Sequence, residues 1–229
     1  MPVIARVAGL LLPHDVSVEQ TDLRQSRLEA VGSAAAGIAH DLNNHFTLIL
    51  NHLSISDLAS ARDAVSRCVS LTSGLLSYCR GESAPLKPVD LAAAVRRFAA
   101  GADLPREVRL NVEIADGLSP ILADENGIDR MLDNLVRNAC SAMKGAGKLR
   151  IVVGPGEIHV QDSGPGIAPE NLRRIFEPFF STRGSGLGLA IVRDIMRRHG
   201  GSVTVDSTPG AGAKFTLRFR SARSLRDCI

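Results

Sequence analysis

The sequence contains no tryptophan, a single tyrosine and no run of more than two consecutive lysines or arginines. Proteins that bind single-stranded nucleic acid stack the bases on aromatic side chains inside a basic groove, so this composition argues against nucleic-acid binding. The longest apolar run near the N-terminus, residues 7–12, is too short to cross a bilayer, and no signal-peptide cleavage pattern follows it. We therefore expect no membrane span in this chain.

Cysteine is also scarce, and its spacing excludes the common zinc motifs. The four residues are Cys68, Cys79, Cys140 and Cys228, with no CxxC pair and no histidine at zinc-ligand spacing. Three of them fall on the apolar side of predicted helices, which indicates buried thiols in a reducing cytoplasm. The hydrophobic fraction of 45% and the net charge of +3 are ordinary for a globular protein of 229 residues.

The first third of the chain has the apolar periodicity of two long helices. From residue 23 to about residue 53, apolar positions alternate in steps of three and four, as in an a/d seam: Leu28, Val31, Ala35, Ile38, Leu42, His45 and Ile49. After a break at 54–60, a second apolar face follows: Val65, Cys68, Val69, Thr72, Leu75, Leu76 and Cys79. So short a connection predicts an antiparallel hairpin. A lone hairpin leaves its seam in water, so we expect a homodimer with a four-helix bundle.

The remainder mixes helices and strands. Two prolines and a glycine within 81–88 indicate a linker. The pattern predicts helices at 91–99, at Glu125–Met143 with Asp124 as the N-cap, and at 187–199, and strands at 108–114, 148–153, 157–161, 202–206 and 214–220. The simplest architecture is an antiparallel sheet with helices packed on one face.

These patterns divide the chain into five segments of an α+β protein. We predict an N-terminal segment at 1–22, a helical hairpin at 23–82 and a linker at 83–88. A mixed domain would then occupy 89–220, and a tail 221–229.

Two motifs in the mixed domain suit nucleotide binding. Asn134 and Asn138 lie one helical turn apart on one face, and a neutral amide oxygen suits a Mg²⁺ ion that also binds phosphate. Asp162 follows a predicted strand and precedes Gly164 and Gly166, whose lack of a Cβ would let a planar base approach. Its carboxylate can accept a hydrogen bond from the adenine amine and would reject guanine. Taken alone, such asparagines are usually surface residues, and such an aspartate usually belongs to a turn.

A third motif, Gly184-Ser185-Gly186-Leu187-Gly188, precedes an amphipathic helix. The N–H groups of such a loop, together with a helix N-terminus, form a phosphate-binding concavity. Arg183 stands next to it and could reach a terminal phosphate. Neither a P-loop nor a GxGxxG motif occurs in the chain.

Together, the motifs between Asp124 and Arg220 resemble the ATP-binding domain of histidine kinases. They are similar to its N box (Asn134, Asn138), first glycine box (Asp162, Gly164, Gly166), F box (Phe176–Phe180) and second glycine box (Gly184, Gly186, Gly188). The resemblance implies a Bergerat α/β sandwich that binds ATP and Mg²⁺ beneath a lid, with Asn138 on the metal. Further nucleotide contacts implied by these boxes are Ile167, Phe180, Arg183, Ser185 and Leu187.

Upstream, residues 37–44 resemble the phosphoacceptor H box of histidine kinases, nearest the nitrogen-regulation type. The seam assignment independently places His40 at an f position, where it would be exposed as a phosphoacceptor must be. Asp41 can hold the second ring N–H and raise the basicity of the attacking nitrogen. By resemblance, Asn44 orients a water against a phospho-aspartate in the reverse reaction. The other histidines, His199 among them, are interpreted as structural or incidental.

The sequence therefore predicts a cytoplasmic, homodimeric protein-histidine kinase whose partner is a response regulator. One alternative is a regulator-binding module that binds nucleotide weakly and acts mainly as a phosphatase; another is an ATPase of the same superfamily without a phosphohistidine. The complete set of glycine boxes argues against the first, and the H box against the second. Only residues 181–183 separate the F box from the second glycine box, so a short lid and weak nucleotide binding are expected. Ser141 stands where relatives often carry a basic residue, a role that Lys144 or Arg183 could fill.

Overall fold

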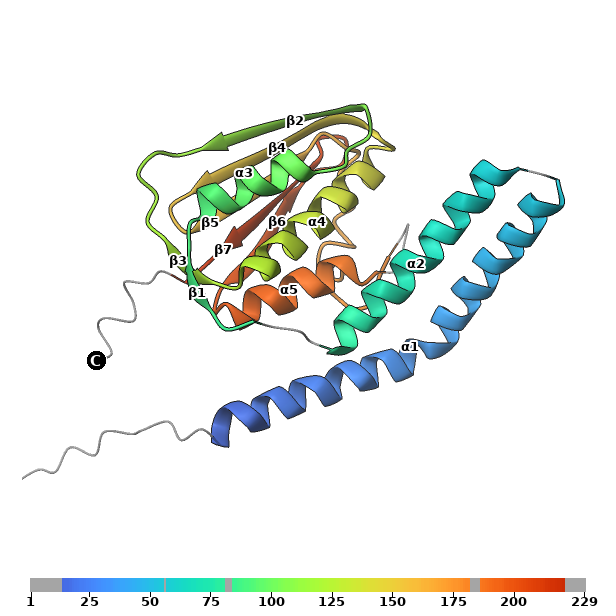
Figure 1. Ribbon diagram of the computed structural model, residues 1–229, viewed down its shortest axis with the longest axis horizontal. Coiled ribbons are helices and arrows are strands. Elements are labelled where there is room, and N and C mark those ends of the chain that lie inside the picture. Colours follow the sequence, from blue (N-terminus) through green and yellow to red (C-terminus); the bar gives the residue numbers. More distant parts are fainter. Residues whose placement is uncertain (1–13, 56, 81–83, 182–185, 221–229) are drawn as a thin grey trace, which may run out of the picture. The chain divides into compact units, whose positions relative to one another are not determined.

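A computed structural model describes residues 14–55, 57–80, 84–181 and 186–220. The chain divides into two units, Met1–Gly81 and Glu82–Ile229, and each is described by itself (Figure 1). Within the described ranges, no helix is both long enough and apolar enough to cross a membrane.

The first unit is the expected antiparallel hairpin of two helices, α1 (His14–Ser54) and α2 (Leu58–Arg80). The Asp57 carboxylate accepts a hydrogen bond from the Ser60 N–H at 3.1 Å, which satisfies a free donor in the first turn of α2. Helix α1 begins nine residues before the predicted position 23. Apolar periodicity detects only the packed part of a helix, and no glycine or proline interrupts residues 14–22.

The packing of this hairpin differs in part from the predicted seam. Five seam residues of α1 are half-buried, namely Val31, Ile38, Leu42, His45 and Ile49, whereas Leu28 and Ala35 are exposed. On α2 the buried residues are Ala61, Ala64 and Cys68. Several larger apolar side chains remain exposed within the single hairpin: Leu28, Phe46, Leu50, Leu53, Val65, Val69 and Leu76. This exposed stripe is consistent with the predicted pairing of two copies, which stays a prediction.

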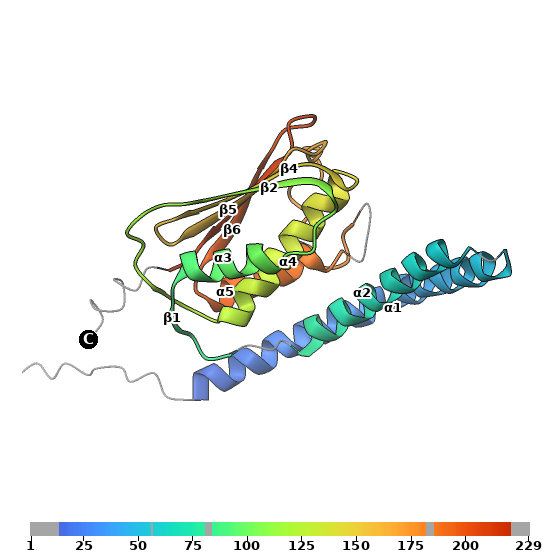
Figure 2. The same cartoon turned by 45° about the horizontal axis from the view of Figure 1, so that its top comes forward.

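The second unit is a two-layer sandwich. Its five-stranded sheet has the order β2 (Glu107–Ile114), β4 (Ala146–Gly154), β5 (Glu157–Asp162), β7 (Ala213–Arg218) and β6 (Ser202–Ser207). Three helices cover one face of the sheet: α3 (Leu91–Gly101), α4 (Glu125–Ala142) and α5 (Gly188–Arg198) (Figures 1 and 2). The helices and strands predicted for this unit are thus present, with boundaries that differ by at most two residues.

The sheet is mixed, so the expectation of a purely antiparallel sheet was wrong. Strand β2 pairs with β4 in parallel, with Glu107 opposite Ala146 and Ile114 opposite Val153. Parallel neighbours need a crossover connection, and α4 supplies it here. Two strands were missed, β1 (Lys87–Val89) and β3 (Ile121–Ala123), which form a separate antiparallel pair. Three residues are too few to show a strand pattern in sequence.

The core lies between the helices and the sheet. It contains alternate residues of the central strands, Leu149, Ile151, Val153, Ile158, Val160, Phe215 and Leu217, and the inner faces of α4 and α5, Ile128, Met131, Leu132, Leu135, Val192, Ile195 and Met196. Cys68 is buried, while Cys79 and Cys140 are half-buried, and all three are free thiols. Cys228 lies outside the described residues.

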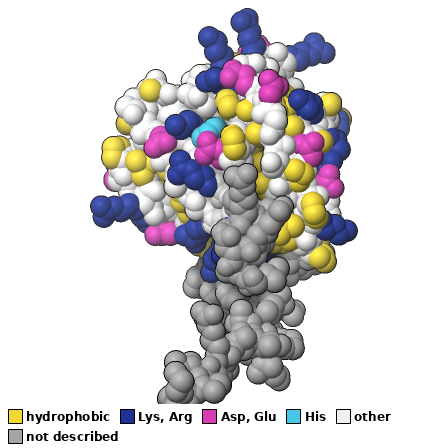
Figure 3. All heavy atoms as spheres, turned by 90° about the vertical axis from the view of Figure 1, so that its left-hand side faces the viewer, with side chains coloured by type: hydrophobic (Ala, Val, Ile, Leu, Met, Phe, Trp, Pro, Cys, Tyr) yellow, Lys and Arg dark blue, Asp and Glu magenta, His cyan; other side chains and the backbone are white. Residues whose placement is uncertain are grey.

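The other face of the sheet is open and carries paired charges. Glu113 of β2 pairs with Arg150 of β4, and Lys214 pairs with Asp206 across β6 and β7 at 3.3 Å. Along β4, buried residues such as Leu149 and Ile151 alternate with exposed ones such as Arg150, which is typical of a sheet with one packed and one solvated face. On the side of the molecule drawn in Figure 3, which is the left-hand side of Figure 1, acidic and basic side chains are interspersed.

The cap of α3 gives a first testable prediction. The Asp90 carboxylate accepts hydrogen bonds from the N–H groups of Ala92 at 2.8 Å and Ala93 at 3.1 Å. We expect Asp90→Ala to lower the free energy of unfolding by about 1 kcal/mol, because these two donors lose their acceptor. Urea denaturation followed by circular dichroism would measure the change. Asp116→Ala, in an exposed turn, is the control. Equal losses in both variants would contradict the role of the cap.

Candidate active site

Helix α4 carries the two predicted asparagines. It begins at the N-cap Asp124, whose Oδ1 accepts a hydrogen bond from the Asn126 N–H at 3.1 Å. One face of the helix is buried against the sheet, including Ile128, Leu132, Leu135 and Ala139. Asn134 is half-buried and Asn138 is exposed, so both lie off the packed face.

The two asparagines have different surroundings. The Asn134 Nδ2 donates to the Arg130 carbonyl at 2.8 Å, and a Cβ at Gly188 would lie only 3.0 Å from the Asn134 Oδ1. The N box therefore contacts the first residue of α5, where the second glycine box ends. The Asn138 side chain makes no hydrogen bond with any described residue, so its amide oxygen is available to a ligand such as Mg²⁺.

Asp162 lies at the end of β5 and is only 6% exposed. Its Oδ1 accepts a hydrogen bond from the Gly164 N–H at 2.8 Å. Burial raises the pKa of this carboxyl, while hydrogen bonds from the N–H groups of Gly164 and Ala213 oppose the shift. A Cβ at Gly164 would lie 3.5 Å from the side chains of Ala142 and Met143. The first glycine box therefore lies beside the C-terminal end of α4.

The glycines of this loop have a structural role that the sequence did not reveal. Gly166 has φ = +72°, and a Cβ there would lie 2.2 Å from the Thr208 carbonyl oxygen. Gly212 has φ = +81°, and its Cβ would lie 2.0 Å from the Asp162 carbonyl oxygen. Any side chain at either position would collide with backbone. The sequence attributed Gly166 to the approach of a base, but close packing of two protein loops already requires glycine there.

Ser207 joins the same two loops. Its Oγ accepts a hydrogen bond from the Ile167 N–H at 2.9 Å and donates one to the Gly212 carbonyl at 2.7 Å. Sequence analysis missed Ser207 and Gly212, because only the pairing of β6 with β7 brings them beside β5. Gly210, in the turn between β6 and β7, donates its N–H to the Pro165 carbonyl at 2.7 Å, a contact that the sequence did not indicate.

The F box and the second glycine box are joined by backbone contacts. The Phe179 N–H donates to the Gly186 carbonyl at 3.0 Å, and both residues have positive φ, +65° and +67°. Phe180 is half-buried, with the Arg174 guanidinium 4.3 Å above its ring. The predicted contacts Arg183, Gly184 and Ser185 lie outside the described residues.

The start of α5 has the features of an anion site. Gly188 is its first residue, and no side chain caps the helix within the described ranges. The N–H groups of such a first turn are available to a phosphate. Leu187 is buried, so its side chain belongs to the core and only its backbone could contact a nucleotide.

The H box lies in the other unit, on α1. His40 and Asp41 are within the helix, but their side chains are outside what the structure describes, so the predicted exposure of His40 stays untested. Asn44, one turn further along, is exposed.

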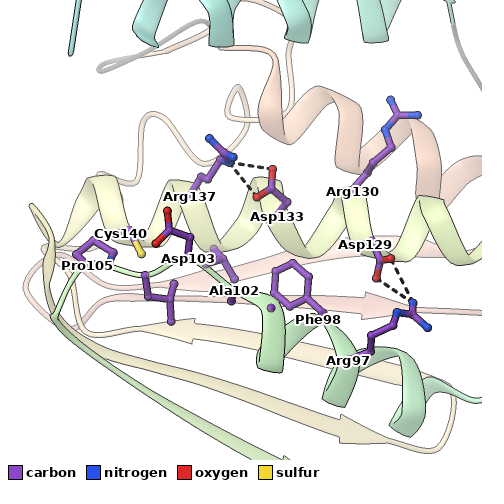
Figure 4. A pocket seen from close by; sticks show the side chains of 13 residues that line it. Arg97, Phe98, Ala102, Asp103, Pro105, Asp129, Arg130, Asp133, Arg137 and Cys140 are labelled. Carbon is purple, nitrogen blue, oxygen red and sulfur yellow. Dashed lines mark hydrogen bonds and ion pairs between the residues drawn. The ribbon is translucent and has the colours of Figure 1, made fainter. Parts of the chain in front are cut away.

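A hollow of about 740 Å³ lies elsewhere, between α3 and α4 (Figure 4). Neither Asn134 nor Asn138 lines it. Two of its arginines are paired with carboxylates: Arg137 contacts Asp133 at 2.9 Å, and Arg97 contacts Asp129 at 3.2 Å as well as Glu125 outside the hollow. These pairs make it a poor site for a triphosphate.

Comparison with known proteins places this site in a family. Residues 123–223 match the family model of the histidine kinase-, DNA gyrase B- and HSP90-like ATPases. Over 218 residues, 85% of this chain is 34% identical to the sensor histidine kinase ZraS of Escherichia coli O157:H7. The chain belongs to the sensor histidine kinases. It spans about half the length of the curated relatives that it matches, 47% in the case of ZraS.

Solved histidine kinase structures have the same architecture. Histidine kinase ThkA, in a complex with response regulator protein TrrA, has a TM-score of 0.73 at 24% identity, covering 91% of this chain and 67% of ThkA. Full-length ShkA in complex with AMPPNP has a TM-score of 0.59 at 27% identity, covering 92% of this chain and 47% of ShkA. The expected fold class of the histidine kinase, a helical hairpin followed by a Bergerat-type α/β sandwich, is confirmed.

Replacing Asp162 should separate nucleotide binding from stability. Because burial raises the pKa of this carboxyl, its charged form is less favourable in the fold than in water, and its contribution to stability falls as pH rises through the folded pKa. Asp162→Asn should therefore unfold at pH 7 no more readily than wild type. Its ATP affinity should fall at least tenfold, because the amide can turn its N–H₂ toward the adenine amine.

Differential scanning calorimetry at pH 5 and pH 7 and titration calorimetry with ATP would measure these two effects. Asp116→Asn, in an exposed turn of the same unit, is the control. Wild-type ATP affinity in Asp162→Asn would contradict the assignment of this carboxylate to the base.

Proposed function

We propose that this chain is an ATP-dependent protein-histidine kinase that phosphorylates itself on His40 and passes the phosphoryl group to an aspartate of a response regulator. The observation that carries the proposal is the contact of Asn134 with Gly188. It brings the amide face of α4 to the start of α5, which no side chain of the described residues caps, on a chain that also contains an H box on α1.

Three features of the second unit support ATP as the phosphoryl donor. The buried Asp162 offers a carboxylate for the adenine amine, and the first turn of α5 offers N–H groups for the phosphates. Asn138 offers an unpaired amide oxygen for Mg²⁺, which when bound would neutralise charge on the phosphate oxygens. The AMPPNP in the ShkA complex supports a nucleotide in this fold.

The chemistry at the H box would require His40 to be a neutral imidazole, with one ring nitrogen free of a proton. A ring nitrogen of His40 attacks the γ-phosphorus, an N–P bond forms, and the P–O bond to ADP breaks. The Asp41 carboxylate would accept a hydrogen bond from the N–H of the other ring nitrogen and so hold the ring in orientation. In the next step an aspartate carboxylate of the regulator takes the phosphoryl group and restores His40.

The proposed assembly is a homodimer formed through the hairpin. The exposed apolar stripe along α1 and α2, which includes Phe46, Leu50 and Val69, would be buried by a second copy. A cytoplasmic location, like the response regulator as partner, belongs to the same proposal.

Autophosphorylation tests the proposal directly. Incubation of the purified chain with γ-labelled ATP and Mg²⁺ should give a protein adduct that is labile to acid and stable to base. His40→Gln should abolish labelling while ATP binding persists, because the ATP-binding residues lie in the other unit. His52→Gln, on the same helix, is the matched control and should label normally. Labelling of His40→Gln would show that the H-box assignment is wrong.

Asn44 should separate the kinase from the phosphatase reaction. It lies about 5.4 Å along α1 from His40, too far to serve the imidazole directly but able to orient a water over it. Asn44→Ala should keep autophosphorylation within a few-fold, while dephosphorylation of the phosphorylated regulator falls at least tenfold. Asn43→Ala is the control, since Asn43 is equally exposed but points about 100° away around the helix. Parallel loss of both activities in Asn44→Ala would count against the water-orienting role.

A further inference from the structure

A buried histidine lies at the end of α5. His199 is 5% exposed and packs edge-on against the Phe219 ring, with 5.8 Å between the ring centroids. Its Nδ1 is 2.8 Å from the Ile195 carbonyl oxygen, and its Nε2 is 2.8 Å from the backbone nitrogen of Asp124. The imidazole therefore bridges the last turn of α5 and the N-cap of α4.

The two partners fix the protonation of this ring. The Asp124 N–H is a donor, so the Nε2 of His199 must accept and carries no proton. The Ile195 carbonyl is an acceptor, so Nδ1 must carry the proton. His199 is thus a neutral Nδ1–H imidazole with both nitrogens in hydrogen bonds. A second proton on Nε2 would face the Asp124 N–H and break the bridge.

This bridge lies at one end of the packing of α4 against α5, and a second close approach lies nearer the candidate site. The near contact joins Asn134 to Gly188 at the candidate site, and the far contact joins Asp124 to His199. Asn134 is ten residues from Asp124, and Gly188 is eleven residues from His199, so both spans are about 15 Å long. The two helices run antiparallel, with one contact at each end of the shared length.

The residues around the far contact are closely packed. A Cβ at Gly127 would lie 3.2 Å from both the His199 Cε1 and the Asp124 Oδ2, tighter than an ordinary contact. The Asp124 carboxylate is also engaged, by the N–H groups of Asn126 and of Ala84 at 3.2 Å. The start of α4 is therefore held on several sides, and the hydrogen bond from the Asp124 N–H to His199 connects it to the end of α5.

We propose that His199 is a positioning residue for the nucleotide site. By holding the start of α4 to the end of α5, it fixes how far the two helices slide and rotate against each other. That register sets Asn134 and Asn138 relative to the N–H groups at the start of α5. The proposal deepens the proposed function and rests on it, because the register matters only if ATP binds there.

The decisive variants at position 199 remove or keep the hydrogen-bond acceptor for the Asp124 N–H. His199→Phe keeps a planar ring but leaves the buried Asp124 N–H without an acceptor. His199→Gln offers an amide oxygen near the position of Nε2 and should restore the bond. His159→Phe is the matched control, because the His159 ring contacts Thr216 and Glu157 at 3.0 Å within the sheet and makes no hydrogen bond to α4 or α5.

Titration calorimetry of each full-length variant with ATP and Mg²⁺, at a temperature below its unfolding transition, measures the effect. We expect His199→Phe to bind ATP at least tenfold more weakly, which is about 1.4 kcal/mol, and His199→Gln to stay within about threefold of wild type. In autophosphorylation, His199→Phe should raise the KM for ATP more than it lowers kcat. His159→Phe should leave both constants unchanged.

Nitrogen NMR of the wild-type chain provides a readout that does not depend on any variant folding. The His199 imidazole should show a protonated Nδ1 and an unprotonated Nε2 at pH 7, the less common tautomer of free histidine. An Nε2-protonated ring would overturn the proposal. Wild-type ATP affinity in His199→Phe would also overturn the proposal, because the hydrogen bond from Asp124 to His199 would then contribute to stability alone. Failure of the wild type itself to bind ATP would instead refute the proposed function, and this inference with it.

Discussion

The antiparallel packing of α4 on α5 is the constraint on which the rest of the site depends. It places Asn134 against Gly188, and Asn138 lies exposed one helical turn further along α4. The sheet beneath adds the third component, because the loop that leaves β5 packs beside the last turn of α4. Shifting either helix by one turn would separate groups that must act on one ligand.

The charges of the second unit fit a site in which backbone N–H groups bind the phosphates and one buried carboxylate, that of Asp162, binds the base. Two arginines near α4 are neutralised locally, Arg137 by Asp133 and Arg97 by Asp129 and Glu125. In the proposed complex, the negative phosphates would be met by N–H groups at the start of α5 and by a Mg²⁺ on Asn138. Such an arrangement selects its ligand by geometry, because a helix N-terminus is fixed by the packing of the whole helix.

Local patterns in the sequence were enough to predict most elements and the order of the boxes. The helix from Glu125 and its cap Asp124 have strong periodicity, and the turns at Pro155-Gly156 and Pro209-Gly210 have strong turn chemistry. The parallel pairing of β2 with β4 and the two strands of three residues depend on tertiary packing, and nothing local indicated them.

The site residues that the sequence did not reveal were missed for the same reason, namely their dependence on tertiary packing. Ser207, Gly212 and His199 contact partners 40 to 75 positions away, as in the hydrogen bonds from Ile167 to Ser207 and from Asp124 to His199. His199 was interpreted as structural or incidental, and the structure shows a structural bridge. Its only sequence signal was its place before Gly200-Gly201, which marks a helix end without saying what the ring contacts.

The central claim is that ATP binds between α4, α5 and the loop after β5. Amide NMR of the full chain during titration with a non-hydrolysable ATP analogue and Mg²⁺ tests it most directly. The account predicts the largest shift changes at Asn134, Asn138, Asp162–Ile167 and the first turn of α5. Shift changes confined to the hollow between α3 and α4, around Phe98 and Cys140, would contradict it.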